Sequence, residues 1–364
     1  MKKISVSVIN DLATDQRVYR TCLVLHEMGF EITLIGRKLP DSLPIERPYK
    51  IKRFKFLINK SPIFYLAYNL RLFFYLLGTH QDILWANDLD TLLANSLISI
   101  IKNKPLIYDS HELFTESTQL YKRNFVKKMW EIIENFCFNH VDTFITVSEP
   151  IAAFYKKKYK KPIYVIRNLP IRFYADDKLS HSKDKFTLVM QGNVNIHRGY
   201  EEAILSLKQL DDVFMYIIGN GDAINKLKDI IEKEKINHKV QLISKQPYEE
   251  MMRYTSSADV GLRLENPDSL NSYYSLPNKI FEYIQAGIPI IATNLPEIKK
   301  IIETYEIGIL IDEPTPEAIA EAVNKLKNDH NLYNKLKENV NKAAAELTWE
   351  NERKKLQGLL EKYL

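Results

Sequence analysis

Cysteine is scarce in this sequence, since only Cys22 and Cys137 occur among 364 residues. Both lie in stretches with a helical pattern and are far apart along the chain. A disulfide framework needs more cysteines and a structural zinc site needs them clustered, so both kinds of protein are excluded. We expect two reduced, buried thiols in a cytoplasmic protein.

Long apolar segments are missing as well. The nearest candidate, Pro62–Gly78, has 17 residues and is interrupted by Asn69 and Arg71. An arginine near the bilayer centre costs about 2.5–3.5 kcal/mol on insertion scales. We therefore expect a helix that is covered on several sides or partly exposed on a membrane-facing surface, not a spanning one. The opening MKKISVSVIND predicts a β-strand instead of a signal peptide, because Ser and Asn break its apolar run.

Several signatures of catalysis and metal binding are also absent. The sequence has no Cys/His spacing typical of zinc sites, no Gly-x-Ser-x-Gly, no P-loop and no complete dinucleotide fingerprint. Asp88 and Asp90 form an Asp-x-Asp pattern that superficially resembles a manganese site. They begin a predicted helix, where acidic residues are favoured for capping and dipole reasons. We expect neither a metal nor a cofactor.

The net charge of +5 is unevenly distributed. Residues 1–168 carry 25 Lys and Arg against 16 Asp and Glu, whereas residues 169–364 carry 26 against 30. Basic residues gather at 50–60, just before the aromatic helix, and at 156–161. They suit an anionic membrane surface or a phosphate-bearing acceptor, although a solvated lysine-rich face is equally open. No nucleic-acid-binding motif accompanies the charge, so nucleic acid is not an expected partner.

Short β-branched segments alternate with helical ones along the whole chain, which predicts parallel sheets covered by helices on both faces. Strands are expected at 4–9, 31–35, 82–86, 105–109, 142–147 and 162–166. Helical patterns occupy 15–28, 89–103 and 122–140. After a polar, aperiodic linker at 167–185, strands are expected at 186–192, 213–219, 239–244, 258–264, 288–293 and 307–312. Ligands of such sheets lie at the carboxyl ends of the strands.

One loop at a predicted strand end combines an imidazole with carboxylates. Asp109, His111 and Glu112 follow an apolar strand directly. The imidazole can donate a hydrogen bond to a sugar hydroxyl or titrate near neutral pH. The alternative is that Asp109 or Ser110 caps the next helix and His111 has no role.

A second set of loops is rich in glycine. Gly192 and Asn193 follow a strand, and Arg198 precedes the next helix. The glycine lets the backbone approach a ligand, the helix offers free N–H groups, and the arginine can clamp a diphosphate. Gly219 and Gly221 form another such turn. Ordinary turns also use glycine, so this pattern is weak by itself.

The third candidate is the helix that begins at Asn278. Pro277 and Gly287 mark its two ends, and Asn278, Lys279 and Glu282 lie within its first two turns. Backbone N–H groups and an ammonium suit phosphate oxygens, and a carboxylate suits paired ribose hydroxyls. A surface ion pair between Lys279 and Glu282 is the plain alternative.

Together these motifs resemble the family-4-type retaining glycosyltransferases, glycosyl transferases group 1, which have the architecture called GT-B. The matching segments, whose order is highly specific, are Asp15–Val18, Tyr108–Glu112, Gly192–Gly199, Gly219–Gly221, Ala258–Leu262, Pro277–Tyr283, Ala286–Pro289 and Thr348–Glu350. The resemblance implies an α/β protein with two Rossmann-like, doubly wound domains facing a central cleft. Residues 1–168 would form the acceptor-side domain and 169–347 the nucleotide-sugar domain, with a helix at 348–364 packing back on the first.

The resemblance also implies residue roles. Arg198 and Lys279 would bind the diphosphate, Glu282 the donor ribose and His111 the transferred sugar, and Asn278 would lie along the diphosphate and sugar. Further donor-binding positions would be Gly192, Asn193, Gly219, Gly221, Ser244, Lys245, Tyr274 and Leu276. The phosphate or acceptor side would include Asp15, Arg17, Asp109 and Glu112.

The activity implied by the resemblance is metal-independent transfer of a sugar, with retention, from a nucleotide-diphosphate sugar to an acceptor hydroxyl. A glycan or lipid-linked saccharide of bacterial surface-polysaccharide or glycolipid assembly is the expected acceptor, at the inner face of the cytoplasmic membrane. Two positions depart from the family pattern: Asn193 stands where many relatives have Arg, and Tyr274 where the first glutamate of Glu-x7-Glu would stand. These departures leave a catalytically silent nucleotide-sugar-binding protein open as an alternative. A nucleotide-sugar epimerase, which shares the architecture, is a second alternative.

Overall fold

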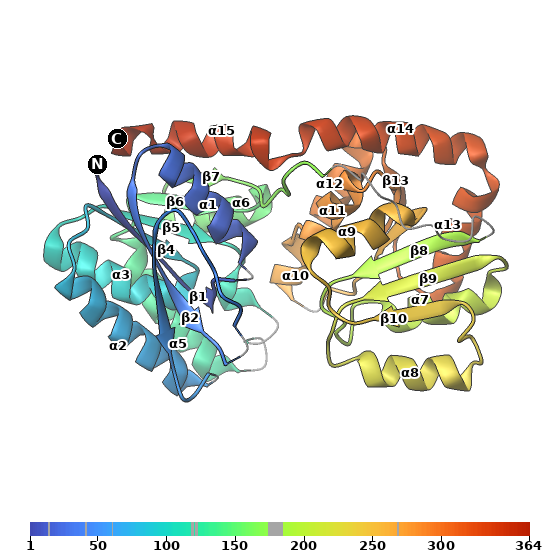
Figure 1. Ribbon diagram of the computed structural model, residues 1–364, viewed down its shortest axis with the longest axis horizontal. Coiled ribbons are helices and arrows are strands. Elements are labelled where there is room, and N and C mark those ends of the chain that lie inside the picture. The colour runs from blue at the N-terminus through green and yellow to red at the C-terminus, as the bar shows by residue number, and fades with distance from the viewer. Residues whose placement is uncertain are drawn as a thin grey trace. The chain divides into compact units, whose positions relative to one another are not determined.

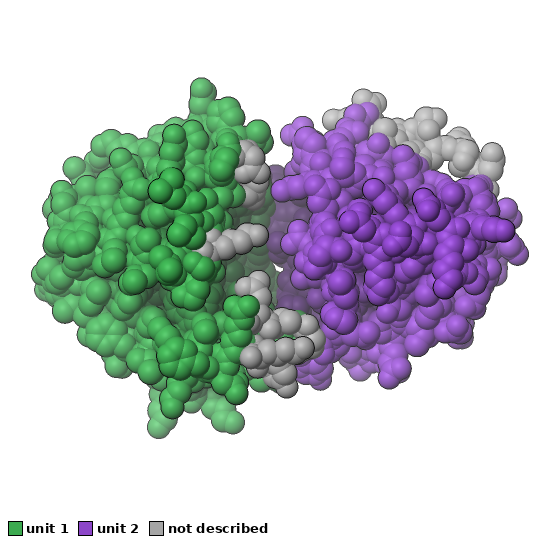
Figure 2. All heavy atoms as spheres, turned by 90° about the horizontal axis from the view of Figure 1, so that it is seen from below, with its two compact units in different colours: residues 1–168, 269–272, 353–364 green, residues 169–268, 273–352 purple. Residues whose placement is uncertain are grey.

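The computed structural model (Figure 1) describes residues 1–13, 15–40, 42–59, 61–117, 120, 123–173, 185–267 and 269–364. Lys60 of the basic cluster and residues 174–184 of the predicted linker lie outside the described residues. Two compact units make up the chain, shown in green and purple in Figure 2. The first comprises residues 1–168, 269–272 and 353–364, and the second 169–268 and 273–352.

The first unit is built on a seven-stranded parallel sheet in the order β3-β2-β1-β4-β5-β6-β7. Its strands are β1 (Lys3–Asp11), β2 (Glu31–Lys38), β3 (Lys50–Lys55), β4 (Ile83–Asn87), β5 (Leu106–Ser110), β6 (Thr143–Thr146) and β7 (Ile163–Val165). Every residue of β4, β5 and β6 is buried. Burial on both faces explains why these strands read as continuous apolar runs.

Helices cover both faces of this sheet. They are α1 (Gln16–Glu27), α2 (Pro62–Gly78), α3 (Leu89–Lys102), the short η1 (Phe114–Glu116), α5 (Asn124–Phe138) and α6 (Glu149–Tyr159). Helices α2, α3 and α5 lie together on one face, with α3 in contact with both of the others (Figure 1). The final turn of the chain also belongs to this unit, since the Tyr363 hydroxyl lies 2.7 Å from Thr143 Oγ1 of β6.

The second unit has a six-stranded parallel sheet in the order β10-β9-β8-β11-β12-β13. Its strands are β8 (Phe186–Gln191), β9 (Val213–Ile218), β10 (Val240–Ile243), β11 (Val260–Arg263), β12 (Ile290–Thr293) and β13 (Gly308–Ile311). Alternate residues of β8 enter different cores: Leu188 and Met190 pack in one, Val189 in the other. The sheet is thus buried on both faces.

Eleven helical segments complete the described part of the second half of the chain. They are α7 (Tyr200–Ser206), η2 (Leu207–Gln209), α8 (Ile224–Lys233), α9 (Tyr248–Ser257), α10 (Leu270–Tyr274), α11 (Asn278–Gln285), α12 (Pro296–Tyr305), α13 (Pro316–Asn328), α14 (His330–Glu346), α15 (Trp349–Leu360) and η3 (Glu361–Tyr363). Helices α7, α8 and α13 contribute to one core and α9, α11, α12 and α14 to the other. The unit boundary falls within α15, between Glu352 and Arg353.

The predicted strands are confirmed to within a few residues, and two parallel-sheet, Rossmann-like domains give the chain the α/β GT-B fold. Cys22 and Cys137 are free and buried, as predicted. Strand β3 is not predicted by the pattern, because its sequence KIKRFK reads as a basic cluster. It is an edge strand, where exposed lysines are tolerated because only one side is paired.

Helix α2 has the predicted limits, Pro62–Gly78, and only one of its faces is covered. Phe64, Tyr68, Leu72 and Leu76 are buried, and the Tyr68 hydroxyl donates to the carbonyl of Val8 at 2.7 Å. Among the described residues, no helix is both long and apolar enough to cross a membrane.

The orientation of α2 predicts unequal costs for two matched truncations. Leu72→Ala should lower the free energy of unfolding by about 2–5 kcal/mol, because it leaves a cavity at a side chain that is 0% exposed. Leu70→Ala, at a side chain that is 51% exposed, should change it by less than about 0.5 kcal/mol. Urea unfolding followed by circular dichroism measures both, and equal costs would contradict the orientation.

Candidate functional site

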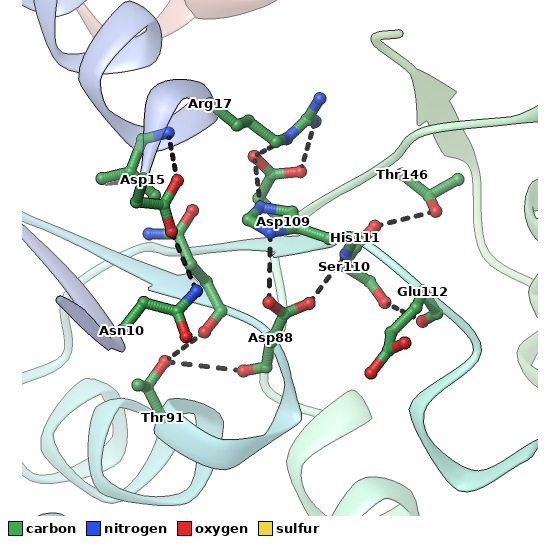
Figure 3. A network of polar contacts seen from close by, with 12 residues as sticks. Asn10, Asp15, Arg17, Asp88, Thr91, Asp109, Ser110, His111, Glu112 and Thr146 are labelled. Atoms are coloured by element: carbon green, nitrogen blue, oxygen red, sulfur yellow. Dashed lines mark hydrogen bonds and ion pairs between the residues drawn. The ribbon is translucent and has the colours of Figure 1, made fainter. Parts of the chain in front are cut away.

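The first group of candidate residues is held together by a buried ion pair between Arg17 and Asp109 (Figure 3). Arg17 lies in the first turn of α1, and Asp109 lies near the carboxyl end of β5. The guanidinium Nε and Nη2 atoms donate to the two carboxylate oxygens at 3.0 and 2.6 Å, and Nη1 donates to the carbonyl of Ile166 at 2.9 Å. This bidentate geometry fixes both side chains at the strand ends.

The His111 imidazole lies between two carboxylates. Its Nδ1 is 3.1 Å from Asp88 Oδ2, and its Nε2 is 3.5 Å from Asp109 Oδ2 (Figure 3). The backbone N–H of His111 also donates to Asp88 Oδ1 at 2.8 Å. Nε2 is buried and forms no hydrogen bond with any described residue. The ring therefore has a fixed orientation, in which each nitrogen faces a carboxylate.

Asp88 corrects an expectation from the sequence. It precedes α3, but its carboxylate makes no capping hydrogen bond to that helix, because both oxygens bind His111. Its backbone has φ +58°, a region that Asp and Asn tolerate better than most residues. Asp88 thus belongs to the network around His111, which the sequence did not predict. The described residues include no group of three or more His, Cys, Asp or Glu that could hold a metal ion.

These carboxylates keep His111 charged. Burial alone would lower the pKa of His111, but Asp88 and Asp109 outweigh it and raise the pKa to about 10. Burial likewise would raise the pKa of Asp109, whereas Arg17 and His111 hold it at about 2. At neutral pH the imidazolium carries a proton on both nitrogens.

The surroundings of Glu112 disfavour its charged form. Burial, together with the charge of Asp88, raises the pKa of Glu112 to about 7, and Asn271 opposes the shift by donating to its Oε2 at 3.0 Å. Asn271 Oδ1 also accepts from the backbone N–H of Leu113 at 2.9 Å, within the same unit.

Asp90 is a second carboxyl group whose pKa is raised. Burial and the neighbouring Asp88 and Glu112 cause this shift.

Asp15 is engaged in local structure. Its Oδ1 accepts from the backbone N–H of Val18 at 3.0 Å, which caps α1, and its Oδ2 accepts from Asn10 Nδ2 at 2.9 Å. The cap fixes the start of α1 and with it the position of Arg17.

In the second unit, Lys279 lies directly over Gly192. A Cβ atom at Gly192, which has φ +114°, would fall 2.4 Å from Lys279 Cε and 2.9 Å from Nζ. Gly192 follows β8, and Lys279 is the second residue of α11. The positive φ favours glycine at this strand end. The loop after β8 therefore lies next to the ammonium of Lys279, which belongs to the first turn of α11.

Glu282 is oriented by two side chains that the sequence did not identify. Gln191 Nε2 donates to Glu282 Oε2 at 2.6 Å, and the hydroxyl of Thr255 in α9 donates to Gln191 Oε1. Gln191 is the last residue of β8, directly before Gly192. The sequence signal for a role of Gln191 is its position at the end of a predicted strand.

The turn at Gly219 packs against the same loop. Gly219 has φ +147°, and a Cβ there would lie 1.8 Å from the carbonyl oxygen of Gly192. The carbonyl of Val194 lies 2.0 Å from the Cβ position of Gly221. Gly192, Gly219 and Gly221 thus form one packed surface at the carboxyl ends of β8 and β9.

The other predicted donor residues lie around these loops. Arg198 is half-buried, and neither it nor Lys279 has a hydrogen bond or ion pair with any described residue. Asn193, Asn278, Ser244 and Lys245 are exposed. The Lys245 backbone N–H donates to Asn220 Oδ1 at 3.1 Å.

Two predicted residues near α11 have mainly packing contacts. The Tyr274 ring contacts that of Tyr273, and Leu276 packs against the core beneath α11. The described hydrogen bonds and ion pairs do not link Tyr274 or Arg198 to Glu282. The structure therefore brings Gly192, Lys279 and Glu282 together, with Arg198 near the start of the next helix.

Comparisons with known proteins agree with this fold. Residues 173–343 match the family described as Glycosyl transferases group 1, and residues 15–169 match Glycosyltransferase Family 4. Sucrose-phosphate synthase from Thermosynechococcus elongatus superimposes with a TM-score of 0.77 at 15% identity, covering 100% of this chain and 99% of that one. Anabaena HepE in complex with UDP and glucose gives 0.75 at 14%, with 100% and 99% covered. This chain belongs to the family-4-type, group 1 glycosyltransferases.

Curated relatives match over shorter stretches. The amylovoran biosynthesis glycosyltransferase AmsK of Erwinia amylovora is 30% identical over 126 residues, which are 34% of this chain and 31% of AmsK. The D-inositol 3-phosphate glycosyltransferase of Corynebacterium urealyticum is 26% identical over 130 residues, 36% of this chain. The chain spans about a third of the length of these two relatives, 31% and 29%.

The network around His111 predicts the effect of Asp88→Asn. The amide keeps an oxygen that can accept from the His111 backbone and suits the positive φ, so only the charge is removed. The pKa of His111 should fall well below about 10. Titration of the imidazole by NMR measures this, with Asp211→Asn, at an exposed site of the second unit, as the control.

The same shift has a consequence for stability. Because folding raises the pKa of His111, the protonated imidazole stabilises the folded state. This contribution is complete below a pH of about 6.5 and is lost as the pH rises through about 10. The free energy of unfolding should therefore decline over this range in the wild type and decline less in Asp88→Asn. Identical imidazole titrations in the two proteins would contradict the assigned ion pair.

Proposed function

We propose that this protein is a glycosyltransferase that moves a sugar from a nucleotide-diphosphate sugar to an acceptor hydroxyl. The observation that carries the proposal is the arrangement of Gly192, Lys279 and Glu282, which combines a cation, a helix start and an oriented carboxylate. Membership of the glycosyltransferase family supports it, as does the similarity to HepE, whose structure holds UDP and glucose.

The donor diphosphate is proposed to bind at Lys279 and Arg198. Both are cations without a partner among the described residues, and α11 offers the backbone N–H groups of Asn278 and Lys279 at its start. Glu282 would accept from two ribose hydroxyls, and its hydrogen bond from Gln191 would fix the carboxylate. The backbone at Ser244 and Lys245 would face the nucleobase.

Further residues would complete the donor site. Gly192, Gly219 and Gly221 would permit close approach of the diphosphate, because no Cβ stands between it and the strand ends. Asn193, Tyr274 and Leu276 would line the donor beside them. With Asn193 in place of an arginine, charge compensation falls on Arg198 and Lys279.

The proposed reaction breaks the bond between the anomeric carbon and the phosphate oxygen and forms one to the acceptor oxygen. Charge builds on the leaving diphosphate, and Arg198, Lys279 and the α11 N–H groups would stabilise it. The acceptor hydroxyl would attack from the leaving-group face, and a phosphate oxygen would take its proton, with retention of configuration. No metal is needed in this scheme.

Roles are also proposed for residues of the first unit. His111, held between Asp88 and Asp109, would contact the transferred sugar. Arg17 and Asp109 would hold His111 in place, and Asp15 would fix the helix that carries Arg17. Glu112 would lie on the acceptor side, where its raised pKa suits proton exchange. The acceptor would be a glycan or lipid-linked saccharide of bacterial surface-polysaccharide assembly, handled in the cytoplasm.

Loss of a donor contact should weaken nucleotide-sugar binding. Arg198→Ala, Lys279→Ala and Glu282→Gln should each raise the Kd by about 10- to 100-fold, the range expected for a charge-assisted hydrogen bond. Isothermal calorimetry with UDP and then a panel of nucleotide sugars measures this. Lys208→Ala is the control, because Lys208 is an exposed lysine of the same unit, paired with Glu234.

Unchanged affinity in all three variants would contradict the proposed donor site. Tight binding with no turnover of any nucleotide sugar would favour the silent binding protein suggested by Tyr274 and Asn193. An isomerised donor in the absence of acceptor would favour the epimerase.

The charge compensation assigned to Arg198 and Lys279 also predicts how turnover responds to chelation. Excess EDTA should leave donor turnover unchanged, because the two cations take the place of a metal at the diphosphate. The glycoside formed on the acceptor should keep the anomeric configuration of the donor, which NMR of its anomeric proton measures. An inverted product, or activity that is lost with EDTA and restored by manganese, would overturn the mechanism.

A further inference from the structure

The outward face of α2 is apolar along its whole length. Its exposed side chains, spaced i, i+3, i+7, i+11 and i+14, are Ile63, Leu66, Leu70, Phe74 and Leu77. They are 41% to 65% exposed and lie opposite the buried face of the same helix. A surface helix of a globular protein normally carries polar residues on this side.

Helix α5 repeats this feature. Phe125, Met129, Ile132 and Phe136, spaced i, i+4, i+7 and i+11, are 43% to 78% exposed and oppose the buried Glu134, Cys137 and Phe138. The two helices meet at Tyr65 and Trp130, whose ring centroids are 5.6 Å apart in an edge-to-face contact. We call the two exposed stripes together the α2–α5 surface. In Figure 1 these helices lie together at the lower edge of the first unit.

Cations border the α2 side of this surface, whereas α5 carries Lys127 and Lys128 together with Glu131 and the buried Glu134. The sequence has no Asp or Glu between Glu46 and Asp82, a stretch that includes all of α2. Lys52 Nζ lies 5.7 Å from the ring centre of Tyr75 on α2, and Arg71 stacks over Phe54 at 4.7 Å. Lys128 is exposed on α5. Two fully or largely exposed apolar residues, Leu57 and Ile58, precede α2.

We propose that the α2–α5 surface docks on an anionic lipid bilayer. Apolar stripes bordered by lysine and arginine match the acyl boundary and the charged headgroups of such a membrane. The buried face anchors α2 to the sheet, so the helix lies along the membrane instead of spanning it. A symmetric contact with a second copy would bring together two patches that are both bordered by cations on their α2 side, which disfavours self-association. This inference does not depend on the proposed donor site.

Vesicle co-sedimentation of the full chain tests the docking surface. The wild type should sediment with vesicles of phosphatidylcholine and phosphatidylglycerol, and less with phosphatidylcholine alone or at high salt. The double variant Leu66→Glu/Phe74→Glu should bind the anionic vesicles about tenfold more weakly or less, because it places charge at the acyl boundary. Leu364→Glu is the matched control, an equally exposed leucine at the other side of the first unit, and it should bind as the wild type does.

Two further measurements keep the outcomes distinct. Calorimetry with UDP in the absence of lipid should give the same Kd for the double variant and the wild type, which shows that the variant is folded and separates docking from donor binding. Equal vesicle binding by the double variant, or no binding by the wild type, would overturn the proposal. A wild-type dimer in sedimentation equilibrium that the double variant converts to a monomer, without vesicle binding, would identify a second copy as the occupant instead.

Discussion

The close approach of Lys279 to the backbone of Gly192 is the constraint on which the second unit depends. A Cβ at Gly192 would meet the end of the lysine side chain, and the backbone φ of +114° favours glycine directly after β8. Glu282 lies one turn further along the same helix and is held by Gln191, the residue before that glycine. One strand end thus fixes the positions of a cation and a carboxylate together.

The first unit orders its polar groups in another way. Arg17, Asp109, His111 and Asp88 form an alternating chain of charges, in which each buried charge has an opposite neighbour. Burial of single charges would be costly, and their pairing in sequence removes most of that cost. The result is an imidazolium that stays protonated at neutral pH, with each of its nitrogens facing a carboxylate.

Most of the fold could be predicted from the sequence, because buried parallel strands read as apolar runs separated by helical patterns. Strand β3 could not be predicted, because it lies at the edge of the sheet and its exposed lysines make the sequence read as a basic cluster. The glycines, Lys279 and Glu282 were identifiable as loop residues at strand ends, but their partners were not. Gln191 and Asp88 reach residues 91 and 23 positions away. From the sequence alone, Asp88 resembles a helix cap, because its contact with His111 is visible only in the folded structure.

Determination of the structure with bound UDP tests the central claim most directly. The account predicts that the diphosphate lies at the carboxyl end of β8, with its oxygens within hydrogen-bond distance of Lys279 Nζ and the Arg198 guanidinium. The ribose hydroxyls should donate to Glu282, still held by Gln191. A nucleotide bound elsewhere, or bound with Lys279 and Glu282 directed away from it, would contradict the account.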